Sequence, residues 1–253
     1  MRMNEPSTRE DPLLRWYPEA RFGGFSDIDG TLAFYGRVRA LLSPDARVVD
    51  VGCGRGAHRD DPVAWRREVR VLRGHAQHVV GIDVDPAGAD NPFLDEFRPM
   101  DGSARFPLED AGYEMVVSDC VLEHVRDPEL FFAECWRVLR PGGTLALRTT
   151  NARGYVALAA RVIPNRRHAA VVGRAQEARQ AVDVFPTVYA CNTTGKLRRA
   201  LARAGFSAVV YGYEAEPRYF AFSRFLYALA VLHQRFAPPP LRVSLLAYAR
   251  KPA

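Results

Sequence analysis

The chain is short of the residues that build disulfide frameworks and metal sites. Its four cysteines show no CxxC spacing and no matched histidine pair, so neither a disulfide framework nor a zinc site is expected. They are Cys53, Cys120, Cys135 and Cys191. Lysine occurs only at Lys196 and Lys251, so arginine carries almost all of the positive charge. We therefore predict a reduced protein without a bound metal.

Long apolar runs are also absent. No stretch reaches the roughly 18 uninterrupted apolar residues that a membrane-spanning helix needs. From the polar residues at the start of the sequence we expect no secretory signal. Hydrophobic residues make up 48% of the 253 residues, which excludes a fibrous or wholly disordered protein. The net charge of +6 is weak support for nucleic acid, and no RNA-binding signature accompanies it. We predict a cytoplasmic protein, with its oligomeric state left open.

Short apolar runs alternate with longer amphipathic segments from residue 47 onward. Strands are predicted at residues 48–51, 78–84, 97–101, 114–118, 144–149, 206–213 and 241–249. The clearest helix is 128–139, where apolar residues recur every 3.6 positions, and the Pro-Gly-Gly at 141–143 ends it. This alternation favours an α/β fold, with a mostly parallel sheet covered by helices on both faces.

The first of these strands leads into a turn with glycine at every second position, at Gly52, Gly54 and Gly56. Glycine permits positive φ and removes Cβ atoms where a ligand approaches the backbone. Asp50 precedes the turn, and its carboxylate would repel a pyrophosphate but could pair with the ammonium of a cofactor that carries an amino acid. The charge therefore favours S-adenosylmethionine over NAD as the cofactor.

Three further segments follow this turn in order: Gly-Ile-Asp-Val-Asp at 81–85, Met-Asp-Gly-Ser at 100–103, and 113–143, which contains Leu-Glu-His-Val and Arg-Val-Leu-Arg-Pro-Gly-Gly. Together with the turn they resemble the class I S-adenosylmethionine-dependent methyltransferases. The resemblance covers residues 47–151 closely. It implies a Rossmann-like, seven-stranded, mostly parallel sheet with an antiparallel last strand and a helical insert before it.

The resemblance also implies roles for single residues. Asp83 matches the acid that accepts both ribose hydroxyls in that family. Asp101 matches the acid beside the adenine, where it would take the exocyclic amine, and Gly102 would supply the neighbouring backbone contact. These three residues, with Asp50 and the three glycines of the turn, make up the predicted S-adenosylmethionine site.

The predicted activity is methyl transfer to a small-molecule acceptor, at oxygen. His124 is the candidate general base, because it follows the fourth strand on the side where open α/β sheets bind ligands and imidazole titrates near pH 6.5. A structural role, with His124 bonded to its loop, is the alternative. A basic cluster after the fifth strand could hold a phosphate or carboxylate of the acceptor. Its members are Arg161, Arg166, Arg167 and His168.

A competing motif lies near the N-terminus, where Asp27 to Thr31 read Asp-Ile-Asp-Gly-Thr. This matches the signature of haloacid-dehalogenase-like phosphatases, in which the first acid, here Asp27, is the nucleophile and the second, Asp29, the acid/base. The preceding residues 20–25 contain two glycines and an arginine, which make a poor buried strand. We expect a capped turn that opens a helix instead. A phosphatase and a non-catalytic nucleotide-fold protein are the alternative functions.

We expect a leader and lid helix in residues 1–42 and one methyltransferase domain in 43–253, with an acceptor-side segment at 152–192 and an apolar insert at 214–240. Within the insert, residues 218–236 are strongly apolar and aromatic. This segment is too short to cross a bilayer but could lie in the inner membrane interface or cap an apolar acceptor pocket. A buried helix packed on the sheet is the other interpretation.

Overall fold

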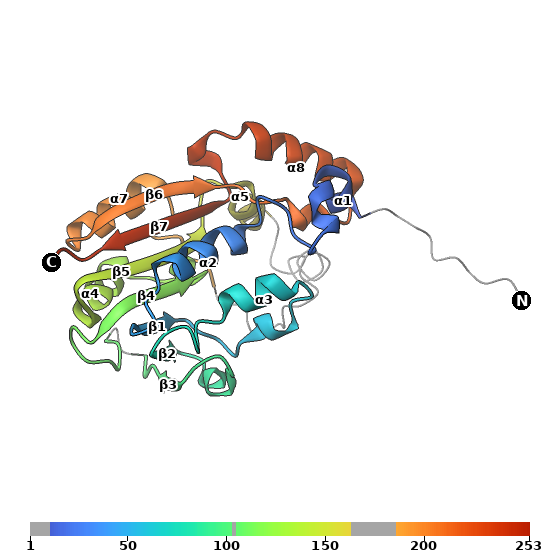
Figure 1. Ribbon diagram of the computed structural model, residues 1–253. Helices are drawn as coiled ribbons and strands as arrows, with labels where there is room; N and C mark the ends of the chain where they lie inside the picture. Colours follow the sequence, from blue (N-terminus) through green and yellow to red (C-terminus); the bar gives the residue numbers. More distant parts are fainter. Residues whose placement is uncertain (1–10, 103–104, 163–185) are drawn as a thin grey trace, which may run out of the picture.

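One seven-stranded sheet organises the molecule. The computed structural model describes residues 11–102, 105–162 and 186–253. The strands run in the order β3-β2-β1-β4-β5-β7-β6 (Figure 1). Their bounds are β1 Arg47–Val51, β2 His78–Asp83, β3 Glu96–Pro99, β4 Tyr113–Asp119, β5 Leu139–Thr150, β6 Ser207–Tyr213 and β7 Ser244–Arg250. The pairs from β3 to β5 are parallel, and β7 is antiparallel to both neighbours. The predicted Rossmann-like sheet with an antiparallel last strand is confirmed.

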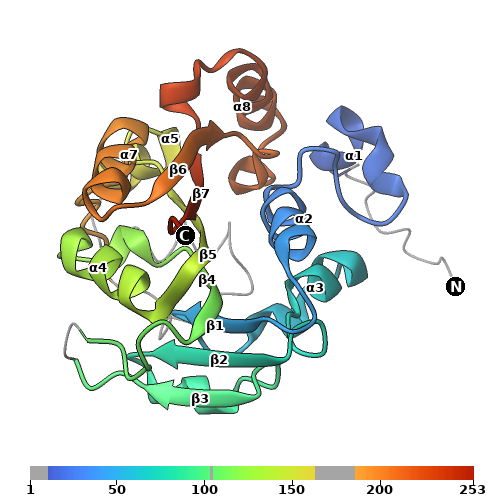
Figure 2. The ribbon, with the colours of Figure 1, turned by 60° about the vertical axis from the view of Figure 1, so that its left-hand side comes forward.

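Helices cover both faces of the sheet (Figure 2). The α-helices are α1 Pro12–Trp16, α2 Gly30–Leu41, α3 Ala64–Arg70, α4 Pro128–Val138, α5 Tyr155–Val162, α7 Thr194–Arg203 and α8 Arg224–Phe236. Short 3-10 helices span η1 Pro18–Arg21, η2 Ala57–Asp60, η3 Pro86–Asp90, η4 Leu122–His124, η6 Arg218–Phe220 and η7 Pro239–Leu241. α8 is the predicted helical insert before the last strand.

Successive residues of β1 show how the two layers form. Val49 packs in a core with α4 and α7, while Val48 packs in a second core with α2 and α3. This alternation follows from the two-residue period of a strand, and apolar residues on both sides are what a doubly covered sheet requires. Phe34 and Val38 of α2 belong to the second core. The lid role predicted for residues 1–42 stays a prediction.

Two of the differences from the predicted boundaries concern the motifs of the predicted site and sheet. α4 ends at Val138 and β5 begins directly at Leu139, so the Pro-Gly-Gly at 141–143 lies inside the strand rather than in a separate turn. There the pairing of β4 with β5 shifts register between Tyr113 and Met115, and Gly142 takes the positive φ (+79°) that this irregularity needs. β3 ends at Pro99, which leaves Asp101 in the following loop.

The Asp-Ile-Asp-Gly-Thr motif forms the expected capped turn. The Asp29 carboxylate is the N-cap of α2 and accepts hydrogen bonds from the backbone N–H groups of Thr31 and Leu32 at 2.9 and 3.0 Å. Its other oxygen pairs with Arg66 of α3 at 2.9 Å. Asp27 is exposed and precedes a helix instead of ending a buried strand. Asp29 therefore connects α2 to α3. Asp27 does not lie at the end of a buried strand, which is where a phosphatase nucleophile of this type would be.

Candidate active site

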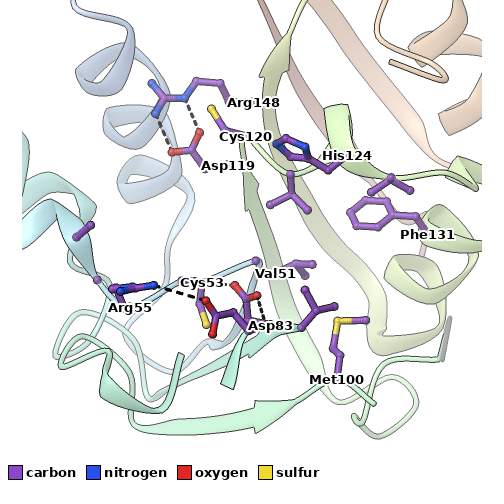
Figure 3. A pocket seen from close by; sticks show the side chains of 18 of the residues that line it. Val51, Cys53, Arg55, Asp83, Met100, Asp119, Cys120, His124, Phe131 and Arg148 are labelled. Atoms are coloured by element: carbon purple, nitrogen blue, oxygen red, sulfur yellow. Dashed lines mark hydrogen bonds and ion pairs between the residues drawn. The ribbon is translucent and has the colours of Figure 1, made fainter. Parts of the chain in front are cut away.

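A cavity of about 580 Å³ lies at the carboxyl ends of β1, β2 and β4 (Figure 3). This is where open α/β sheets bind ligands, and the volume suits a nucleotide-sized molecule. The cavity brings together five of the predicted site residues. They are Gly52, Gly54, Gly56, Asp83 and His124. Asp50, Asp101 and Gly102 are not among the described residues that line it.

The three glycines of the turn have different surroundings, although all have positive φ. A Cβ on Gly52 would overlap Cγ2 of Val121, and one on Gly56 would lie 2.7 Å from Oδ1 of Asn91. Gly54 has a φ of +52° and no atom within 4 Å of such a Cβ. The first and third glycines thus permit close packing of the loop, while the second leaves its face open to the cavity.

Two side chains hold this loop in place. Asp83 at the end of β2 accepts a hydrogen bond from the Gly54 N–H at 2.8 Å on Oδ2 and from the Asp85 N–H at 2.9 Å on Oδ1. Asn91 donates from Nδ2 to the carbonyls of Cys53 and Gly54 at 3.0 and 3.1 Å. A carboxylate has about four acceptor positions, so Asp83 retains capacity for further donors from a ligand.

One wall of the cavity is apolar. Met100, Phe106, Val125 and Phe131 line it, and Phe106 packs edge-on against Phe131 with ring centroids 6.0 Å apart. Such a wall suits a planar base. Asp101 and Gly102 follow Met100 but are exposed in the loop after β3, so their predicted adenine contacts stay predictions. Of the predicted basic cluster, Arg166, Arg167 and His168 lie outside the described residues, as does the side chain of Arg161.

A charged pair on the opposite side was not predicted. Arg148 donates to both oxygens of Asp119, from Nε at 2.6 Å and from Nη2 at 2.7 Å, and the Tyr35 hydroxyl donates to Oδ2 at 3.2 Å. Burial alone would raise the pKa of Asp119, but the charge and hydrogen bonds of Arg148 outweigh it and lower the pKa to about 2. Asp119 therefore stays ionised inside the cavity. Asp119 and Arg148 are directly paired across β4 and β5. The register of these two strands is therefore the feature that could have identified the pair.

Arg70 at the end of α3 also lines this side of the cavity. Its Nη2 is 3.7 Å from Oδ2 of Asp119, too long for a hydrogen bond, and its Nε is buried without a hydrogen-bond partner. Within the described part of the chain, no hydrogen bond satisfies a donor of this guanidinium. Asp50 lies half-buried in β1. Burial first and the charge of Asp119 second raise the pKa of Asp50 to about 7, and Arg70 opposes the rise.

His124 lies in η4 and faces the cavity (Figure 3). Its Nδ1 is 3.0 Å from the carbonyl oxygen of Pro186. Since a carbonyl only accepts, Nδ1 carries a hydrogen and donates it to Pro186. His124 therefore bonds its neighbouring loop through Nδ1, and its ring lies at the wall of the cavity.

The neighbouring Glu123 anchors that loop. Its carboxylate accepts hydrogen bonds from the hydroxyls of Thr149 and Thr150 at 2.7 and 3.1 Å. Its backbone carbonyl accepts from the N–H groups of Val188 and Tyr189 at 2.7 and 3.1 Å. Glu123 is buried, so this arrangement fixes the segment that carries Pro186 against the end of β5.

The sequence of the central segment matches a known family. Residues 49–147 match the family described as "Methyltransferase domain". This chain carries a class I methyltransferase domain. The matched segment contains the glycine-rich turn, Asp83, Asp119 and His124, so the methyltransferase resemblance found on those motifs is confirmed.

The names of individual relatives differ both in the group transferred and in the acceptor. The chain is 31% identical over 158 residues to a ubiquinone biosynthesis O-methyltransferase of Hahella chejuensis, which covers 59% of this chain and 62% of that protein. It is 36% identical over 131 residues to a tRNA U34 carboxymethyltransferase of Methylococcus capsulatus, covering 47% and 37%. The chain thus spans less than two thirds of the length of these curated relatives.

The fold extends beyond the matched segment. A chain of the solved complex between the Haloferax volcanii Trm112 methyltransferase activator and a methyltransferase superimposes with a TM-score of 0.55 at 19% identity, covering 96% of both chains. At that identity the likeness concerns the fold alone.

Proposed function

We propose that this protein transfers a methyl group from S-adenosylmethionine to a small-molecule acceptor, at an oxygen atom. The observation that carries the proposal is the open face of Gly54 in the cavity, beside a buried carboxylate, Asp83, that is already fixed to the same loop. Bound cofactor would supply a methyl group on a positively charged sulfur.

The residues present fit this cofactor at each of its parts. The remaining acceptor positions of Asp83 suit ribose hydroxyls, and the wall of Phe106 and Phe131 suits the adenine. The unfilled donors of Arg70 suit the carboxylate of the amino-acid part. Its ammonium would lie near the carboxylates of Asp50 and Asp119, and the pairing with Asp50 predicted from the sequence remains part of this proposal.

Methyl transfer from a sulfonium needs alignment more than acid catalysis, because the leaving group is a neutral thioether. The rigid loop and the apolar wall would hold the reacting atoms in line and exclude water. An acceptor hydroxyl must lose its proton as the new O–CH₃ bond forms, and Nε2 of His124 would accept that proton. A base with this function favours an oxygen acceptor, and the similarity to an O-methyltransferase points the same way.

The test is to incubate the protein with methyl-labelled S-adenosylmethionine and, separately, a low-molecular-mass cell extract and an RNA fraction. We expect label in the small-molecule fraction, in a product whose methyl group is bound to oxygen by mass spectrometry. A Gly54→Val variant serves as the inactive control. Label found only in RNA, or on nitrogen or carbon, would contradict the acceptor proposal while leaving methyl transfer intact.

A further inference from the structure

Helix α8 has two different apolar faces. Tyr227, Ala230 and Val231 are buried, and Tyr227 and Val231 form a small core with Tyr17, joined by Trp16 at its edge. This face therefore packs against α1 and its C-cap residue Tyr17, rather than on the sheet as the buried-helix interpretation had it. No residue of α8 is among the described residues that line the active-site cavity, and the role of α8 as a cap over an acceptor pocket stays a prediction.

The opposite face of α8 is apolar and exposed. Phe225 is 72% exposed, Leu229 48%, Leu232 55% and Phe236 75%. At 100° per residue these four side chains fall within roughly 60° of one another, so they form one stripe along the helix. Phe222, just before the helix, is also exposed. An uninterrupted stripe of this kind marks an interaction surface rather than ordinary scattered exposure.

The charge beside the stripe is of one sign. From Pro217 to Ala253 the sequence contains no aspartate or glutamate. Arg224 and Arg235 lie about 20° apart on the helix, along one edge of the stripe. Neither forms an ion pair with a carboxylate in the described part of the chain, and the Arg235 guanidinium lies 5.8 Å above the ring of Trp16. The edge therefore offers cationic groups to a partner.

The position of α8 lets a flat surface reach it. Both ribbon views place the helix at the outer rim of the molecule, with α1 beside it (Figures 1 and 2). No helix in the described ranges is long and apolar enough to cross a membrane. The exposed stripe runs along the length of α8, so it enters a bilayer surface when the helix lies parallel to that surface.

We propose that α8 docks this protein on an anionic lipid surface. The stripe of Phe225, Leu229, Leu232 and Phe236 enters the boundary between headgroups and acyl chains, while Arg224 and Arg235 contact anionic headgroups. A second copy of the chain fits this face less well. A symmetric dimer through α8 would bring the two arginine edges together without any carboxylate between them. The inference is independent of the proposed methyl transfer.

The test is co-sedimentation with vesicles of phosphatidylcholine alone and of phosphatidylcholine with about 30% phosphatidylglycerol. We expect the wild-type protein to sediment with the anionic vesicles and to bind neutral vesicles at least tenfold more weakly. Phe225→Ser with Phe236→Ser should lower binding to anionic vesicles at least tenfold, and Arg224→Glu severalfold. Leu130→Ser, at an exposed leucine of α4, is the matched control and should bind as the wild type does.

Melting temperatures of all variants establish that they are folded, which is expected because the substituted side chains are exposed. Failure of the wild type to sediment with anionic vesicles would overturn the proposal, and so would equal losses for the stripe variant and Leu130→Ser. A lipid-free dimer in sedimentation velocity that the stripe variant abolishes would also overturn it, because the second copy would then be the partner.

Discussion

Gly54 offers a sharp test of the cofactor site, because a second glycine provides a matched control. Gly74 lies in an exposed loop outside the cavity lining, has a φ of +80° and, like Gly54, has no atom within 4 Å of the position that a Cβ would take. The Cβ of a valine at either position therefore meets no atom of the described residues beyond its own chain neighbours. Both variants incur the same kind of backbone strain, but only Gly54→Val places carbon atoms inside the cavity.

The strain of a β-branched residue at positive φ costs about 1–2 kcal/mol. For a chain of this length, each 1 kcal/mol lowers the melting temperature by roughly 2–4 °C, so both variants should melt about 2–8 °C below the wild type. Binding of S-adenosylhomocysteine should fall about 100-fold for Gly54→Val, which is roughly 2.7 kcal/mol, and stay within twofold for Gly74→Val. Isothermal titration calorimetry measures both. Equal affinities in the two folded variants would refute a backbone contact at Gly54.

Three other substitutions probe single groups. Arg70→Gln should weaken S-adenosylhomocysteine by about 1.5–3 kcal/mol and leave 5′-methylthioadenosine, which lacks the amino acid, unchanged; equal losses for both ligands would exclude a carboxylate contact. His124→Asn keeps a donor toward Pro186 but removes the base, so kcat should fall about 10²–10⁴-fold at unchanged S-adenosylhomocysteine affinity; an unaltered kcat would leave His124 only its structural role. Burial raises the pKa of Glu214 to about 7. The stabilisation of the fold that comes from protonated Glu214 is therefore fully present below pH 4.5 and is lost as the pH rises through 7. Glu214→Gln should therefore raise stability by about 2–3 kcal/mol at pH 8 and by almost nothing at pH 4.5 in thermal melts; the same gain at both pH values would contradict the assignment.

The sequence predicted those parts of the site that are local. The glycine turn, Asp83 and His124 each follow a strand directly, so the strand pattern alone assigns them to one edge of the sheet. Asp119 and Arg148 are 29 residues apart, and only the register of β4 and β5 pairs them. Asn91 and Pro186 reach the site from loops whose course depends on tertiary packing, so no local pattern identifies them.

The insert at residues 214–240 also shows what the sequence alone could not predict. Its composition predicted an apolar helix, and α8 is one. Whether such a helix is buried or exposed depends on which neighbours reach it. Tyr17, more than 200 residues earlier in the chain, covers one face of α8, while Phe225 and Phe236 on the other face are exposed.

Binding of S-adenosylmethionine in the cavity at the ends of β1, β2 and β4 underlies every other step of the proposed reaction. Calorimetric titration of the purified protein with S-adenosylhomocysteine, and in a separate titration with NAD as the alternative cofactor, tests this binding directly. We predict one S-adenosylhomocysteine bound per chain, displacement by S-adenosylmethionine, loss of binding in Asp83→Ala and no heat with NAD. Binding of NAD, or no S-adenosylhomocysteine binding at millimolar concentration by a folded protein, would contradict this assignment.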